Sequence, residues 1–199
     1  MGKIEARLVG LFKTMPILRS RDLEQSGIKR IEISRYVAAG ELRRLRRGLY
    51  CLPDYRQNEH GDLAIVGKQI PEAMICLLSA LRYHELTTQA PSEIWIAIAR
   101  KARAPSLDKL NLRVMRFGQA ALRHGVELKS IEGVPVRITT VEKTIADCFK
   151  YRSKVGLDVA LEALKDATRQ KRISLNELWA CAKIDRVTNV MHPYLEALV

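Results

Sequence analysis

Four arginines occupy five consecutive positions near the N-terminus, at Arg43, Arg44, Arg46 and Arg47, and no acidic residue lies among them. These guanidinium groups cannot all be buried, because an unpaired charge inside a protein is costly. Arginine binds phosphate through paired hydrogen bonds and also enters the minor groove of DNA. The run therefore favours contact with DNA phosphates or the minor groove, and a hairpin with merely solvated charges is the alternative.

The positive charge of the whole chain is concentrated in the same region. The net charge is +12, and residues 1–56 hold thirteen basic and six acidic residues, which gives +7. The other 143 residues hold 21 basic and 16 acidic residues, which gives only +5. Such an asymmetry is typical of a module that binds a polyanion. A well-solvated basic surface is the alternative.

Three short helices followed by a hairpin must position these arginines. Apolar spacing predicts a helix over residues 3–14, a second over 21–25 capped by Ser20, and a third over 29–39 closed by Gly40. Two short helices joined by a turn that contains Gly27 indicate a helix-turn-helix. Residues 42–52 suit two short strands with a basic turn, which would form the wing of a winged helix.

The third helix has two distinct sides. Counting about 100° per residue places Ile33, Tyr36 and Val37 on one side, facing the first two helices. The opposite side suits the major groove, where arginine pairs with guanine and isoleucine contacts a thymine methyl; for Ile31, packing against its own neighbours is the alternative. The first turn favours phosphate. We therefore predict nine DNA-binding residues: Lys29, Arg30, Ile31, Ser34, Arg35, Arg43, Arg44, Arg46 and Arg47.

The remaining chain predicts a mixed α/β domain after a polar linker at residues 54–61. Capping boxes at Thr139–Glu142 and Ser174–Glu177 open two of the helices, and Glu132-Gly133 turns a hairpin. The fold class is thus α+β, with a winged-helix DNA-binding domain over 1–56 and an α/β domain over 57–199. We predict helices at 62–69, 78–85, 139–150, 157–167, after 174 and at 194–198, and strands at 74–76, 93–98, 112–117, 126–131 and 134–138.

The pattern Gly40-Glu-Leu-Arg-Arg-Leu-Arg-Arg-Gly-Leu-Tyr50 resembles the winged-helix domain of the AbiEi family. Segments 79–87, 133–147 and 156–164 resemble the antitoxin region of that family. The chain departs from the family at Glu85, where glycine is frequent, and at Lys143, where arginine is frequent. The second change puts in doubt any role of this position as an anion clamp, because lysine lacks the bidentate geometry of arginine.

The resemblance implies a DNA-binding transcriptional regulator and antitoxin of a type IV toxin–antitoxin system. Such a protein represses its own operon by binding double-stranded DNA at its own promoter. Its functional partner is a co-encoded nucleotidyltransferase-like toxin, and direct contact with the toxin is not required. A homodimer on DNA is possible if the operator is palindromic.

A catalytic site is not expected. Asp108 precedes Glu127-Leu-Lys129 by nineteen residues, a spacing similar to that of metal-dependent DNA nucleases, but solvated charges on a hairpin explain it better. His60, His84, His124 and His192 lack metal-ligand spacing. We therefore predict that the chain is not an enzyme and has no metal and no cofactor, and the targeted nuclease stays the alternative.

Cysteine spacing and the lengths of apolar runs indicate the cellular compartment. The four cysteines form no C-x-x-C pair, which suits a reducing compartment. No apolar run approaches the ~20 residues of a membrane span, and the first residues lack the apolar core of a signal peptide. We expect a cytoplasmic protein that does not bind membranes.

Overall fold

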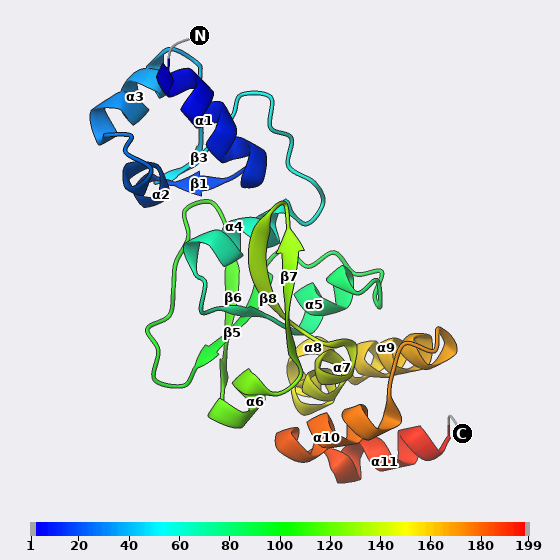
Figure 1. Ribbon diagram of the computed structural model, residues 1–199. Coiled ribbons are helices and arrows are strands. Elements are labelled where there is room, and N and C mark those ends of the chain that lie inside the picture. Colours follow the sequence, from blue (N-terminus) through cyan, green and yellow to red (C-terminus); the bar gives the residue numbers. More distant parts are fainter. Residues whose placement is uncertain (1–2, 198–199) are drawn as a thin grey trace. The chain divides into compact units, whose positions relative to one another are not determined.

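A computed structural model describes residues 3–197, with side chains from residue 8 onward, and it divides into two compact units (Figure 1). The first unit takes in residues up to Pro71, together with 107–109 and 129–136. The second takes in 72–106, 110–128 and the chain from Arg137. Residues 57–71, predicted to open the second domain, thus lie in the first compact unit. The boundary between functional domains, predicted after residue 56, stays a prediction.

The first unit contains the three predicted helices and the predicted hairpin. A third strand, β1, was not predicted because two residues are too short to show alternation. It pairs antiparallel with β3, which also pairs with β2, so the sheet order is β1-β3-β2. The elements are α1 (Lys3–Thr14), β1 (Leu18–Arg19), α2 (Ser20–Gln25), α3 (Arg30–Ala38), β2 (Arg43–Arg46), β3 (Leu49–Cys51) and α4 (Gly61–Gln69).

A small apolar core holds these helices together. Leu23 of α2, Ile28 of the turn and Ile33 of α3 are all buried in it. Gly27 adopts φ +83°, a left-handed conformation that glycine reaches without steric cost, and this lets the chain turn between α2 and α3. The N-cap of α2 is Arg19 and not Ser20 as predicted, because the Asp22 carboxylate accepts the Arg19 backbone N–H at 2.9 Å.

The second unit is built on a sheet with strand order β6-β5-β4-β8-β7. β4 runs antiparallel to β5 and parallel to β8, and β5 runs parallel to β6. The tip of the β7–β8 hairpin, residues 129–136, belongs to the first unit. The strands are β4 (Met74–Ile75), β5 (Ile94–Ala99), β6 (Leu112–Phe117), β7 (Val126–Ile131) and β8 (Val134–Thr139).

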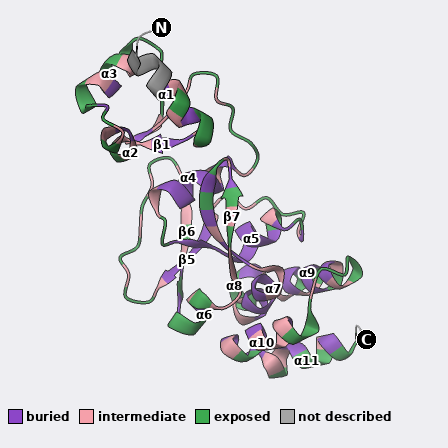
Figure 2. Cartoon of the chain, in the orientation of Figure 1, coloured by how far each residue is buried: buried purple, intermediate pink, exposed green. Residues whose placement is uncertain are grey.

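The helices of the second unit gather around α7, which packs against α5, α9 and α10. The faces that they turn to one another are buried (Figure 2). Within residues 3–197, no helix has both the length and the apolar character needed to cross a membrane. The helices are α5 (Leu77–Tyr83), α6 (Gln119–Arg123), α7 (Val141–Lys150), α8 (Arg152–Val155), α9 (Leu157–Arg169), α10 (Leu175–Asp185) and α11 (Thr188–Glu196).

The starts of α7 and α11 differ from the prediction by more than one residue. The N-cap of α7 is Thr140 and not Thr139, because Thr139 ends β8 and its hydroxyl lies 2.6 Å from that of Thr144. α11 begins six residues earlier than predicted and contains Pro193 in its interior. Burial of Met191 stabilises the turn that precedes this proline. The predicted last residue of this helix, Leu198, lies outside the described residues.

All four cysteines, Cys51, Cys76, Cys148 and Cys181, are free thiols and buried. Burial raises the pKa of each of these thiols above its usual value, to about 12 for Cys181. The thiolate is the reactive form of cysteine, so these side chains have low reactivity in the folded chain.

Candidate nucleic-acid interface

Much of helix α3 is exposed to solvent (Figure 2), and its exposed residues include Arg30, Ser34 and Arg35. Its start is fixed by a capping interaction in which the Lys29 N–H donates to the Glu32 carboxylate at 2.7 Å. Ile33 is buried, so the opposite side of the helix faces outward. Ile31 is 61% exposed there, beside the exposed Ser34 and Arg35. The side chain of Ile31 does not pack into the core, and its contact with DNA stays a prediction.

The β2–β3 hairpin carries the arginine run, and a bulge between Arg44 and Arg46 breaks its regular pairing. Gly48 adopts φ +70° at the turn, and its carbonyl accepts the Ser20 N–H at 3.0 Å. This hydrogen bond ties the hairpin turn to the start of α2. The arginines are therefore presented by a fixed turn.

A cavity of about 310 Å³ lies between α3 and the hairpin. Three arginines, two serines and one tyrosine are among its lining residues, and donors of these types suit a phosphate oxygen. The lining residues are Ser20, Arg30, Ile33, Ser34, Arg44, Arg47, Gly48 and Tyr50. We call this cavity the basic pocket.

The basic pocket brings together four of the nine predicted DNA-binding residues: Arg30, Ser34, Arg44 and Arg47. Lys29, Ile31, Arg35 and Arg43 are exposed but do not line it. Sequence reasoning missed Ser20 and Tyr50 as lining residues. Tyr50 stands at the end of the basic hairpin, but only the fold brings either side chain to α3.

Arg46 differs from the other arginines of the hairpin. Its side chain is only 14% exposed, and one terminal nitrogen donates to the Asp108 carbonyl at 3.0 Å. The other terminal nitrogen lies 3.6 Å from the Asp62 carboxylate. The Arg46 guanidinium is therefore bound within the first unit, where it connects the hairpin to residues 107–109 and to α4.

Asp22 stabilises the helices next to the interface residues through a helix cap and an ion pair. Its carboxylate lies 2.8 Å from the Lys68 ammonium, and Lys68 is itself buried. Burial opposes ionisation of Asp22, but hydrogen bonds from Lys68 and Arg19 outweigh burial and lower its pKa. One carboxylate thus caps α2 and attaches α4, and it keeps its charge in doing so.

The second unit holds a buried cluster of charges in which Lys143 is 0% exposed. The Lys143 ammonium donates to Asp147 and, at 2.9 Å, to Asp185, while Lys150 also reaches Asp185. Burial raises the pKa of Asp147. Burial also disfavours the charge of Asp185, but Lys143 and its other partners outweigh this effect and lower the pKa of Asp185. Lys143 is occupied by carboxylates, so it is unavailable as an anion clamp.

The residues of the nuclease alternative belong to different units. Asp108 is exposed in the first unit, where its carbonyl accepts from Arg46, whereas Glu127 belongs to the second unit. Among the side chains that the structure describes, the clustered His, Cys, Asp and Glu residues with metal-ligand distances include neither of them.

The comparisons agree with this architecture. Residues 7–53 match the model of a family described as a transcriptional regulator, the AbiEi antitoxin. This match confirms the resemblance over the N-terminal segment. The crystal structure of the RV2827C protein from Mycobacterium tuberculosis aligns with a TM-score of 0.62 at 15% identity, over 92% of this chain and 72% of that chain. At this identity the likeness shows the fold, which is α+β. No curated protein matches the chain.

Proposed function

We propose that the chain is a DNA-binding transcriptional regulator that binds an operator through α3 and the β2–β3 hairpin. The basic pocket carries this proposal, because Arg30, Arg44 and Arg47 converge on one cavity beside the exposed face of α3. The pocket would hold a backbone phosphate, which would fix the register of α3 on the duplex. Ile31, Ser34 and Arg35 would then contact base edges in the major groove.

The match of residues 7–53 to an antitoxin family supports a second part of the proposal. The chain would repress its own operon from the cytoplasm, and it would counteract a co-encoded nucleotidyltransferase-like toxin without the need for direct contact. The second unit would supply the antitoxin activity. A homodimer would form on DNA if the operator is palindromic.

Fluorescence anisotropy with DNA from upstream of the gene tests the proposal, with a scrambled duplex of the same composition alongside. We expect binding to the native DNA at least about a thousandfold tighter than to the scrambled duplex. Equal and weak binding to both would contradict a regulator.

Paired variants test the interface itself. Arg44→Ala with Arg47→Ala should weaken binding to both duplexes and reduce the slope of log affinity against log salt by about two. The matched control is Lys101→Ala with Arg103→Ala, which removes two exposed cations from the second unit. If the control pair reduces the slope as much as the pocket pair, the pocket is not the DNA contact.

A further inference from the structure

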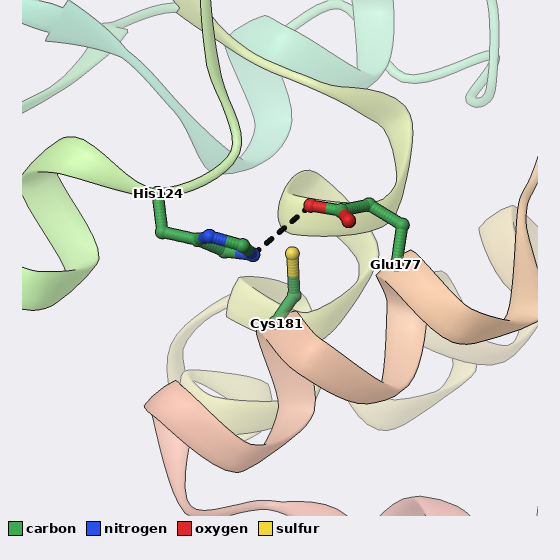
Figure 3. A group of neighbouring side chains, drawn as sticks. All are labelled: His124, Glu177 and Cys181. Atoms are coloured by element: carbon green, nitrogen blue, oxygen red, sulfur yellow. Dashed lines mark ion pairs between the residues drawn. The ribbon is translucent and has the colours of Figure 1, made fainter.

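A group of three potential metal ligands lies in the second unit, away from the basic pocket. His124 follows helix α6, while Glu177 and Cys181 lie on α10, and the three side chains point toward one another (Figure 3). One ligand atom from each residue lies within 4.8 Å of the other two. A zinc ion bound to all three would lie about 2.0–2.3 Å from each ligand atom.

Local structure holds each of these side chains in place. Glu177 and Cys181 are four residues apart, so they share one face of α10. Ser174 caps that helix by accepting the Glu177 N–H, which fixes the turn that carries the carboxylate. Gly125 follows His124 at φ +64°, and a Cβ built there would lie 2.6 Å from the Lys143 Cβ of α7 and 3.3 Å from the Cys181 sulfur of α10. The glycine therefore lets the turn that bears His124 lie close against both helices.

The histidine has a buried nitrogen with no hydrogen bond. The Nε2 atom of His124 is inaccessible to solvent and has no hydrogen-bond partner of good geometry among the described residues. It lies 3.0 Å from a Glu177 oxygen, which is within the distance of an ion pair. A metal ion between the two residues would use the lone pair of a neutral ring and the charge of the carboxylate together.

The donor set selects a class of metal. Imidazole nitrogen, thiolate sulfur and carboxylate oxygen together are typical of zinc, whereas magnesium and calcium prefer oxygen ligands alone. A zinc ion also stabilises the thiolate that burial alone disfavours. Three protein ligands leave one position of a tetrahedral ion for water. The side chains of His124 and Glu177 are 33% and 46% exposed, although the Nε2 atom of His124 is itself inaccessible to solvent.

We propose that His124, Glu177 and Cys181 form a zinc site that joins the α6–β7 turn to helix α10. The proposal is independent of DNA binding, since none of these residues belongs to the basic pocket. An ordinary ion pair beside a buried thiol is the competing explanation.

Metal binding by the full chain tests the site. Protein stripped with a chelator and kept reduced is titrated with Zn²⁺ against a chromogenic chelator, and with Co²⁺ by absorption spectroscopy. We expect one ion per chain, a thiolate-to-cobalt charge-transfer band and the visible spectrum of tetrahedral cobalt. Zinc should also raise the unfolding temperature reported by the fluorescence of Trp95 and Trp179, which both lie in the second unit.

Matched variants identify the ligands. Cys181→Ala should abolish the charge-transfer band. His124→Gln should weaken zinc binding by at least about tenfold, because even substitutions of residues next to metal ligands cause losses of that size. The controls are Cys148→Ala, another buried thiol, and His192→Gln, another histidine paired with a glutamate. Because His124 is partly exposed, its variant reports even if Cys181→Ala unfolds. The proposal is wrong if the wild type lacks the charge-transfer band, or if the two ligand variants bind zinc as tightly as the controls do.

Discussion

The two units use positive charge in opposite ways. In the first, Arg44 and Arg47 lie at the surface around a cavity that suits phosphate. In the second, Lys143 is fully buried between the carboxylates of Asp147 and Asp185. A cation at the surface is available to a partner, whereas a buried cation is tied to partners within its own fold because desolvation is costly. The sign of a side chain's charge therefore indicates its function less well than its burial does.

The largest expected effect comes from breaking the buried cluster. Lys143→Met leaves two carboxylates in the interior without their shared cation, and we expect the second unit to lose about 3–5 kcal/mol of stability. Urea unfolding followed by tryptophan fluorescence measures this loss. DNA affinity in native buffer should stay unchanged.

Lys150→Met is the matched control, because the Lys150 side chain is 33% exposed and contacts the same Asp185. It should cost less than about 1 kcal/mol. Equal losses in the two lysine variants would remove the distinction between buried and exposed cations.

A smaller effect is expected where a buried ion pair supports the surface of the first unit. Asp22→Ala removes the cap of α2 and leaves the buried Lys68 without its carboxylate, at a cost of about 2–3 kcal/mol. Hydrogen exchange of residues 20–38 should rise, while that of α7 and α9 should not. Unchanged exchange in α2 would show that the pair contributes little.

The same carboxylate gives the first unit a dependence on pH. Because the pKa of Asp22 is lowered, its contribution is complete above about pH 3.8 and is lost as the pH falls through the lowered value. Asp22→Asn should flatten this acid-induced loss in the exchange of α2. Asp54→Asn, at an exposed position, serves as the control and should leave the profile as it is.

Arg46 and Arg47 allow an exposed arginine to be compared with a bound one inside the same hairpin. Arg47→Ala should reduce the salt slope of DNA binding by about one, because its exposed charge would contact one phosphate. Arg46→Ala should leave the slope unchanged and cost about 1 kcal/mol of stability, because its side chain bonds within the unit. Anisotropy measures the salt slope and urea unfolding measures the stability. Equal slope changes in the two variants would show that Arg46 contacts DNA as Arg47 does.

The smallest effect concerns specificity. Ile31→Ala removes an exposed apolar side chain from α3, and we expect a loss of about 1 kcal/mol that is confined to operators with thymine at the contacted position. Replacing that thymine by uracil, which lacks the methyl group, should abolish the difference between variant and wild type. A uniform loss on all sequences would place Ile31 outside the base contacts.

Helix periodicity predicted the two sides of α3 correctly, because Ile33 is buried and Ile31 is exposed as its phase requires. Local spacing also predicted most helices and strands and the β7–β8 turn at Glu132-Gly133. The basic pocket was not predictable in full, since Ser20 reaches it only through the hydrogen bond of its backbone to Gly48.

Long-range partners account for the rest of what was missed. Lys143 and Asp147 stand four residues apart on α7, a spacing that periodicity can recognise, but Asp185 comes from α10. Arg46 belonged to a run of equivalent arginines in the sequence, and only the chain at 107–109 distinguishes it. Pairings between distant segments are set by tertiary packing, which local patterns do not encode.

The four buried thiols have a practical consequence for labelling chemistry. Because burial raises the pKa of every native cysteine, maleimide reagents should react slowly with the folded chain. A cysteine introduced by Ile31→Cys would stand on an exposed helix face and react first. One dye could then be attached to α3 without removing any native thiol, and its emission would report directly on what this helix touches.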